Sequence, residues 1–143
     1  MSPPRFHLAF PVRDIETTRH FYAEVLGCQL GRSAERWLDF DFYGHQLSAH
    51  LCADDTNSMS TNEVDQHAVP ARHFGVILAT DQWQQLVARL NDLGVDFYIQ
   101  PYTRFPGAVG EQQTFFIKDP SDNYLEFKTF PNEDKVFSTH SDT

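Results

Sequence analysis

The order of the elements expected from the sequence occurs twice, and this internal repeat limits the fold more than any other feature. Each copy is a strand, a helix and three further strands. His7 and His73 occupy the same place in the two first strands, and Leu26-Gly27 and Leu93-Gly94 end the two helices. Two βαβββ copies predict an α+β fold, in which two half-cups of sheet with outer helices join around a cleft lined by the polar strand faces.

The boundaries of the copies follow from where this pattern starts and stops. The first copy spans about residues 5–52 and the second about 71–130. The polar stretch 53–70 predicts an exposed linker, because it is rich in Asp, Asn and Ser. Residues 131–143 form a tail, and 143 residues is the usual size of one domain, so residues 1–143 are expected to fold as one.

Individual elements come from the spacing of apolar residues. Helices are expected from the cap Asp14 to Gly27 and from a cap at Thr80 or Asp81 to Gly94. The last two strands form a hairpin around the turn 119–123. The other predicted strands are 5–12, 28–32, 37–43, 45–52, 72–79 and 95–100.

Charge and composition exclude several classes of partner. The formal net charge is −9 and the pI is about 5.0, which argues against a nucleic-acid partner, since that needs basic patches. The chain has no apolar run long enough to cross a bilayer and no signal peptide, so no membrane partner is expected. Cys28 and Cys52 predict free thiols in a soluble, cytoplasmic protein, with a disulfide between them as the alternative.

Glu126 is the most informative acidic residue. It stands in the middle of a predicted strand between Leu125 and Phe127, and alternation places it on the opposite face from them. An unpaired carboxylate there is costly, so Glu126 needs a cation. That cation is a metal ion, or else Lys128 or Arg5 in a salt bridge.

Two histidines complete a ligand set with Glu126. His7 and His73 face away from the apolar residues of their strands, as Glu126 does. Two imidazoles and one carboxylate form the set that holds non-haem Fe²⁺, the favoured ion, and related sites hold Mn²⁺, Ni²⁺ or Zn²⁺. His50 is expected at the position equivalent to Glu126 in the first copy, as a fourth ligand, as an acid/base, or as a hydrogen-bonded residue of the cleft wall.

Arg104 and Trp37 are the candidates for substrate binding. Arg104 precedes a loop rich in Gly and Pro, where it clamps an anionic substrate group or is simply solvated. Trp37 lines an aromatic pocket or packs in the fold.

Several motifs of the chain occur together in one known superfamily. They are Phe6-His7-Leu8-Ala9, Phe21-Tyr22, Val25-Leu26-Gly27, His73-Phe74-Gly75-Val76 and Asp119-Pro120-Ser121-Asp122-Asn123-Tyr124-Leu125-Glu126-Phe127. With them the sequence resembles the vicinal-oxygen-chelate superfamily, which includes glyoxalase I, extradiol dioxygenases, fosfomycin-resistance enzymes and bleomycin-binding proteins. The resemblance implies a metal held by His7, His73 and Glu126, a small-molecule substrate bound through adjacent oxygens, and a homodimer.

Within this superfamily, residues 38–47 and Gly110-Glu111-Gln112 resemble predicted dioxygenases of the extradiol type. This implies a histidine acid/base near His50 and a catalytic tyrosine near the carboxylate strand. Tyr124, which shares the face of Glu126, is the candidate for the tyrosine. The function implied is a metal-dependent oxygenase acting on vicinal oxygens. The alternatives are a glyoxalase-like isomerase or lyase and a metal-free drug-binding protein.

Overall fold

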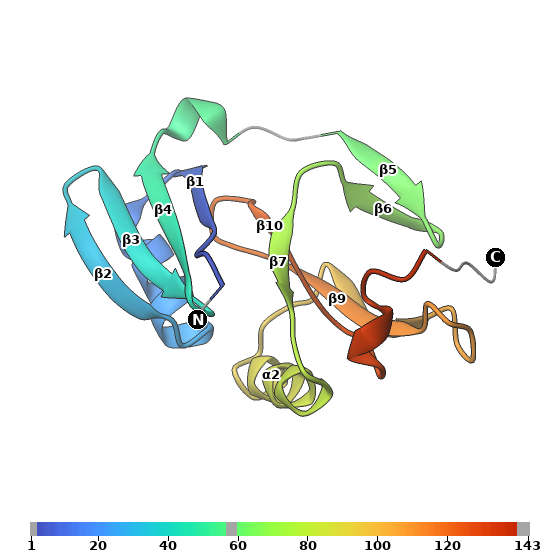
Figure 1. The fold of residues 1–143 in the computed structure, drawn as a ribbon. Coiled ribbons are helices and arrows are strands. Elements are labelled where there is room, and N and C mark those ends of the chain that lie inside the picture. The colour runs from blue at the N-terminus through green and yellow to red at the C-terminus, as the bar shows by residue number, and fades with distance from the viewer. Residues whose placement is uncertain (1–2, 57–59, 140–143) are drawn as a thin grey trace. The chain divides into compact units, whose positions relative to one another are not determined.

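The computed structural model describes residues 3–56 and 60–139, which form two compact units (Figure 1). Over these residues, unit 1 consists of 3–56 together with the turn Asp119–Asn123. Unit 2 consists of 60–118 and 124–139. The turn therefore belongs to unit 1, although both strands that it joins belong to unit 2.

Unit 1 contains a four-stranded sheet in the order β1-β4-β3-β2. β1 runs parallel to β4, and the other neighbouring strands are antiparallel. The helical segment α1–η1 connects β1 to β2. The elements are β1 (His7–Val12), α1 (Ile15–Arg19), the π-helix η1 (His20–Val25), β2 (Gln29–Ala34), β3 (Trp37–Phe42), β4 (His45–Leu51) and the 3₁₀ turn η2 (Ala53–Asp55).

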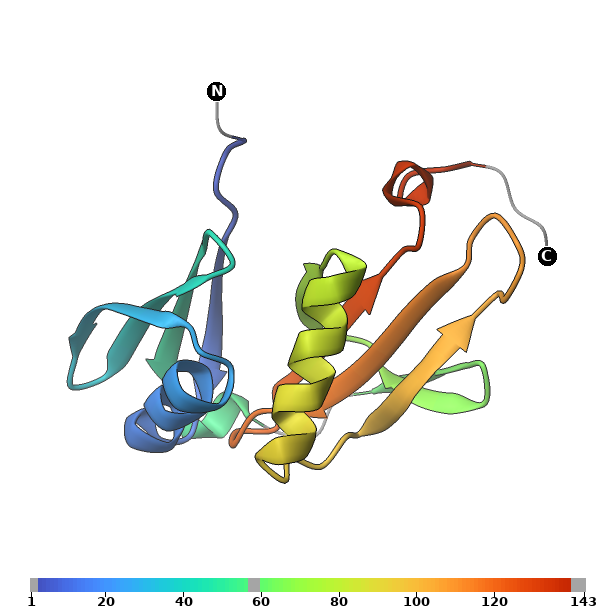
Figure 2. The same ribbon diagram turned by 90° about the horizontal axis from the view of Figure 1, so that it is seen from below.

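Unit 2 repeats this arrangement with the strand order β7-β10-β9-β8, and β7 is parallel to β10. Figure 2 shows α2 lying along one face of this sheet. The same order and the same parallel pair in both units confirm the predicted repeat and the α+β fold. The elements are β5 (Thr61–Val64), β6 (His67–Pro70), β7 (Phe74–Ile77), α2 (Thr80–Asp92), β8 (Ile99–Arg104), β9 (Gln112–Lys118), β10 (Tyr124–Thr129) and the 3₁₀ turn η3 (Glu133–Lys135).

The apolar residues of each sheet pack under its own helix, as alternation requires. In unit 1, Tyr22 of η1 is fully buried and stacks on Phe40 of β3, with ring centroids 4.4 Å apart. In unit 2, Trp83 of α2 contacts Phe115 and donates from its indole nitrogen to the carbonyl of Phe127, 2.8 Å away. The opposite face of each sheet is left for polar residues.

The two helices begin in different ways. Asp14 caps α1 as predicted, because its carboxylate accepts a hydrogen bond from the backbone N–H of Thr17. The predicted side-chain cap of α2 is wrong: its N-cap is Ala79, and the helix begins at Thr80. The hydroxyl of Thr80 instead lies 3.1 Å from that of Thr129 on β10.

Two expectations about strands need correction. The stretch 53–70, predicted as a linker, contains the antiparallel hairpin β5–β6; residues 57–59 of that stretch lie outside the described part. Its turn residues Asp65 and Gln66 both have positive φ, which this kind of hairpin turn requires, but neither is the usual Gly. The strand predicted at 95–100 begins only at Ile99 and continues to Arg104.

The turn 119–123 is held in unit 1 by a buried hydrogen-bond cluster. Asp119, 4% exposed, accepts from the hydroxyl of Tyr22 at 2.9 Å, and burial raises the pKa of this carboxyl. Its other oxygen accepts from the backbone N–H groups of Ser121 and Asn123. The side-chain amide of Asn123 donates to the carbonyl of Pro11 on β1, 2.9 Å away. The Asp-Pro-Ser-Asp-Asn motif thus ties the turn to β1 and η1.

Replacing Tyr22 by Phe should lower the free energy of unfolding of unit 1 by about 1–2 kcal/mol. The substitution keeps the stacked ring but removes a donor from a buried carboxylate, which then loses a hydrogen bond that water cannot replace. Urea unfolding followed by the fluorescence of Trp37 measures the effect. Unchanged stability would mean that the Asp119 cluster does not hold the turn.

Cys28 and Cys52 are both free, as predicted. Burial, followed by the nearby charge of Asp41, raises the pKa of the Cys28 thiol to about 12, so this side chain stays protonated at neutral pH. None of the helices in the described residues is long and apolar enough to span a membrane.

Candidate metal site

His73 and Glu126 meet on the face of the unit 2 sheet opposite α2. The Nε2 atom of His73 lies 3.2 Å from Oε1 of Glu126. Glu126 lies in β10 between Leu125 and Phe127, and both of these neighbours are fully buried under α2. Alternation therefore sends the carboxylate to the other face, as the sequence predicts. Within unit 2 the ionic partner of Glu126 is His73, and not Lys128, which was one alternative to a metal ion.

A hydrogen bond at Nδ1, the nitrogen away from Glu126, orients the imidazole of His73. Nδ1 lies 2.9 Å from the carbonyl oxygen of Pro70, the last residue of β6. Nδ1 must donate this bond, so in the neutral ring Nε2 carries the free lone pair that points toward Glu126. A backbone acceptor on the distal nitrogen is the usual arrangement for a metal-binding histidine. The ring also packs edge-on against Phe116, at 5.0 Å between centroids.

The carboxylate of Glu126 is fixed by Thr114 on β9. The hydroxyl of Thr114, 1% exposed, donates to Oε2 of Glu126 at 2.6 Å. Burial acts to raise the pKa of Glu126, but the hydrogen bonds from His73 and Thr114 together outweigh it, and the pKa lies below the ordinary 4.5. Glu126 therefore keeps its negative charge at neutral pH while Oε1 faces His73.

Gly75 makes the close approach of β7 and β10 possible. In the parallel pairing of these strands, Gly75 is the register partner of Glu126. A Cβ atom added at Gly75 would lie 1.5 Å from the backbone oxygen of Glu126. The motif His73-Phe74-Gly75 thus supplies one candidate ligand and the space for the strand that carries the other.

The separation of the two donor atoms fits a shared divalent ion. Two ligands at about 2.1 Å from one ion lie roughly 3.0 Å apart in octahedral and roughly 3.4 Å apart in tetrahedral coordination. The observed 3.2 Å between Nε2 and Oε1 falls between these values. Within either unit, the described residues bring together no group of three His, Cys, Asp or Glu side chains, so a third protein ligand has to come from elsewhere.

His7, the third predicted ligand, begins β1 in unit 1 and is exposed. It pairs in register with Gln46, while Ala9, two residues later, pairs with Ser48. In unit 2, Gly75 is likewise two residues after His73 and pairs with Glu126. His7 and His73 thus occupy equivalent places in the two units.

The same comparison corrects the expectation for His50. The residue equivalent to Glu126 in unit 1 is Ser48, because each pairs with the residue two after the histidine. Ser48 is buried and donates to the carboxylate of Asp39 at 2.6 Å. His50 lies two residues further along β4, is exposed, and pairs with Pro11 and Trp37.

The other predicted site residues have varied surroundings. Tyr124 is half-buried and packs edge-on against Tyr98, at 4.9 Å between ring centroids. Trp37 is half-buried at the start of β3, opposite His50. Arg104 ends β8, and its Nε donates to the carboxylate of Asp65 at 2.5 Å. Its charge is therefore paired within the chain, which neither predicted alternative included.

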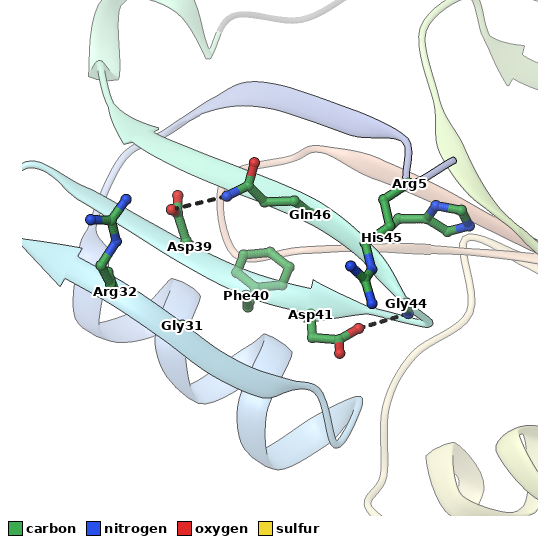
Figure 3. Close-up of a pocket in the computed structure, with 9 residues that line it drawn as sticks. All are labelled: Arg5, Gly31, Arg32, Asp39, Phe40, Asp41, Gly44, His45 and Gln46. Atoms are coloured by element: carbon green, nitrogen blue, oxygen red, sulfur yellow. Dashed lines mark hydrogen bonds between the residues drawn. The ribbon is translucent and has the colours of Figure 1, made fainter. Parts of the chain in front are cut away.

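Some features near the candidate site carry no clear sequence signal. Pro70 and Thr114 orient the side chains of His73 and Glu126, yet only the folded chain brings them there. The structure also shows a cavity of about 340 Å³ on unit 1, beside Arg5, Arg32 and Asp39 (Figure 3), which the sequence did not indicate. Its remaining lining residues are Gly31, Phe40, Asp41, Gly44, His45 and Gln46.

The His73–Glu126 pair should stabilise the metal-free protein most between pH 4.5 and 6.5. The hydrogen bond to Glu126, opposed by burial, raises the pKa of His73 above 6.5, so its contribution is complete below 6.5 and is lost as pH rises through the higher folded value. The lowered pKa of Glu126 makes its contribution complete above 4.5, and it is lost as pH falls through the folded value. The difference in melting temperature between wild type and His73→Gln, measured from pH 3 to 9 with chelator, should peak in this window; a flat difference would contradict the pairing.

Known proteins resemble this chain over most of its length. Residues 6–127 match the model of the glyoxalase/bleomycin resistance protein/dioxygenase superfamily. A solved glyoxalase/bleomycin resistance protein/dioxygenase from Alicyclobacillus acidocaldarius is 34% identical, with a TM-score of 0.76 over 94% of this chain and 96% of that one.

Two further relatives are more distant. A virulence protein of Salmonella typhimurium is 24% identical over 124 residues, which are 87% of this chain and 82% of that protein. The fosfomycin resistance protein FosX of Listeria monocytogenes is 15% identical, with a TM-score of 0.69 over 94% of this chain and 98% of that one, and shows the fold alone. The family match over most of the chain means that this protein belongs to the glyoxalase/bleomycin resistance protein/dioxygenase superfamily.

Proposed function

We propose that this protein is a divalent-metal-dependent enzyme that acts on a small molecule with two neighbouring oxygens. The observation that carries the proposal is the oriented pair of His73 and Glu126, with donor atoms 3.2 Å apart. His7 is the third ligand of the proposal, because it occupies in unit 1 the place of His73 in unit 2. Fe²⁺ is the proposed ion, since two histidines and one carboxylate are its characteristic set, and Mn²⁺, Ni²⁺ and Zn²⁺ suit the same donors.

The roles of the chain's own residues follow from their chemistry. Glu126 supplies one negative charge, and Thr114 keeps one of its oxygens occupied so that the other faces His73. A divalent ion held by this set supplies Lewis acidity toward adjacent substrate oxygens. His50, an exposed imidazole, is the proposed acid/base, and Tyr124 on the face of Glu126 is the proposed phenolic donor.

The first reaction to test is extradiol-type ring cleavage by O₂. The preference of the ligand set for Fe²⁺ supports it, as does the family description, which includes dioxygenases. A glyoxalase-like isomerisation or lysis is the second candidate, supported by the same description. We also propose a homodimer, since twofold dimers are the commonest assemblies among soluble oligomers.

The test is oxygen uptake with catechol by chelator-stripped protein reloaded with Fe²⁺ under argon. We expect uptake that depends on Fe²⁺ and disappears in His73→Ala but not in His20→Ala, which removes an exposed histidine of η1. Bound iron without uptake would contradict dioxygenase chemistry, and turnover of the glutathione–methylglyoxal adduct with Ni²⁺ or Zn²⁺ would then support the second candidate. Failure to bind any of the four ions would contradict the metal-dependent function and favour a metal-free binding protein.

A further inference from the structure

One oxygen of Asp65 accepts two hydrogen bonds from β8. The hydroxyl of Tyr102 donates to Oδ2 of Asp65 at 2.8 Å, and Nε of Arg104 donates to the same oxygen at 2.5 Å. A guanidinium beside a phenolic hydroxyl is a strong recognition site for a carboxylate. The chain therefore contains a built carboxylate site, and in this structure a carboxylate of the chain itself fills it.

This carboxylate site shares a sheet face with the candidate metal ligands. Tyr102 pairs in register with Thr114 on β9, and directly opposed residues of antiparallel strands point to the same face. Thr114 in turn donates to Glu126. Tyr102, Thr114 and Glu126 thus follow one another across three adjacent strands, on the face opposite α2.

A buried acceptor stands beside the same site. Gln112 pairs in register with Arg104 and is 8% exposed. Its Oε1 atom is buried and accepts no hydrogen bond from the described residues, while its amide nitrogen lies 3.3 Å from the carbonyl of Gly110. A buried acceptor without a donor is rare and calls for a physical reason, and the hydroxyl of a ligand supplies such a donor.

The hairpin β5–β6, which carries Asp65, has further contacts with the sheet, among them the ring of His67 against Tyr102 at 4.9 Å between centroids. Asp65 and Gln66 both have left-handed φ values, 50° and 67°, which side chains other than Gly adopt at a cost. The hairpin β5–β6 is also attached to the sheet segment by Tyr98, whose hydroxyl donates to the carbonyl of Ala68 at 2.6 Å. Because the Tyr98 contact does not involve Asp65, the hairpin stays attached when the carboxylate of Asp65 leaves Arg104, and another carboxylate can take its place.

We propose that Tyr102 and Arg104 bind the carboxylate of the substrate, that this carboxylate displaces Asp65, and that the substrate is a small hydroxycarboxylate. Exchange of one carboxylate for another leaves the charge at Arg104 balanced, and the substrate hydroxyl meets Oε1 of Gln112. The assignment to the substrate rests on the proposed function, since Glu126 lies on the same face. The intramolecular Asp65 competes with the substrate and sets a threshold concentration for binding.

The test is a glycolate titration of the metal-free, full-length protein, followed by NMR of the Arg104 Nε–H signal. Asp65→Asn removes the competing charge and keeps the size, so its dissociation constant for glycolate should be about tenfold or more below that of wild type. Glycolamide, which lacks the charge, should not bind, and Tyr102→Phe in the Asp65→Asn background, which keeps the Arg104 reporter but removes the second donor, should weaken the response. Asp65→Ala serves as a second variant, with circular dichroism to confirm that each protein is folded.

Two results would overturn the proposal. If folded Asp65→Asn and Asp65→Ala respond to glycolate no more than to sodium chloride of equal ionic strength, Asp65 only fastens the hairpin and no carboxylate site exists. If glycolate binds but loading with Fe²⁺ or Mn²⁺ does not tighten its binding, the site is not part of the substrate site. Because the first titration contains no metal, its outcome does not depend on whether the metal-dependent function is correct.

Discussion

Replacing Gly75 by Ala should lower the free energy of unfolding of unit 2 by about 4 kcal/mol or more. The new Cβ would lie 1.5 Å from the backbone oxygen of Glu126, so β7 and β10 must separate. Steric conflict with a backbone atom cannot be relieved by a rotamer change, which places this substitution among the most damaging. At roughly 2–4 °C for each kcal/mol, the melting temperature should fall by about 10 °C.

A matched glycine separates this effect from a general intolerance of alanine. Gly110→Ala places its Cβ 3.5 Å from the ring of Phe105, which is an ordinary contact, and should change stability by less than about 1 kcal/mol. Trp37 lies in unit 1 and Trp83 in unit 2, so a Trp37→Phe background lets fluorescence report unit 2 alone. A Gly75→Ala protein with the stability of Gly110→Ala would show that β7 and β10 are not paired as described.

Replacing Glu126 by Gln should weaken the binding of Fe²⁺ or Mn²⁺ by about 100-fold or more. The substitution keeps the shape of the side chain but removes the negative charge that lies beside His73. Loss of a group that merely orients a ligand typically costs 10–100-fold in metal affinity, so loss of the charged ligand itself should reach or exceed the upper end. Isothermal titration of the apoprotein measures the affinity directly.

Glu63→Gln is the control for this measurement. Glu63 is an exposed residue of β5 in the same unit, and its replacement removes the same charge from a strand outside the sheet that carries Glu126. Its affinity should stay within about twofold of wild type, since exposed charges are screened by solvent. Equal losses in the two variants would indicate that only net charge, not a ligand, governs binding.

The sequence predicted the repeat, the fold class, and the sheet face on which His73 and Glu126 lie. These depend on local rules: alternation along a strand fixes the face of Glu126, and glycines such as Gly94, at φ 71°, end helices. The family resemblance is confirmed as well. A single domain, the metal ligands His7, His73 and Glu126, the roles of His50 and Tyr124, and the dimer stay predictions.

What the sequence did not predict depends on register and on contacts between distant residues. The equivalence of Ser48, not His50, to Glu126 follows from which residues pair across strands, which alternation within one strand cannot specify. The hairpin β5–β6 was missed because Asp65-Gln66 lacks the glycine that usually marks such a turn. Arg104 was expected to be solvated or to hold a ligand, and only the folded chain brings Asp65 to it.

The central claim is that His7, His73 and Glu126 together hold one divalent ion. The most direct test is a crystal structure of the protein grown with Mn²⁺ and recorded at a wavelength where manganese scatters anomalously. We expect one strong anomalous peak per chain, coordinated by Nε2 of His73, by Glu126 and by the imidazole of His7, from the same chain or from a partner. A structure with no peak at His73 and Glu126, or with an ion there that no His7 contacts, would contradict it.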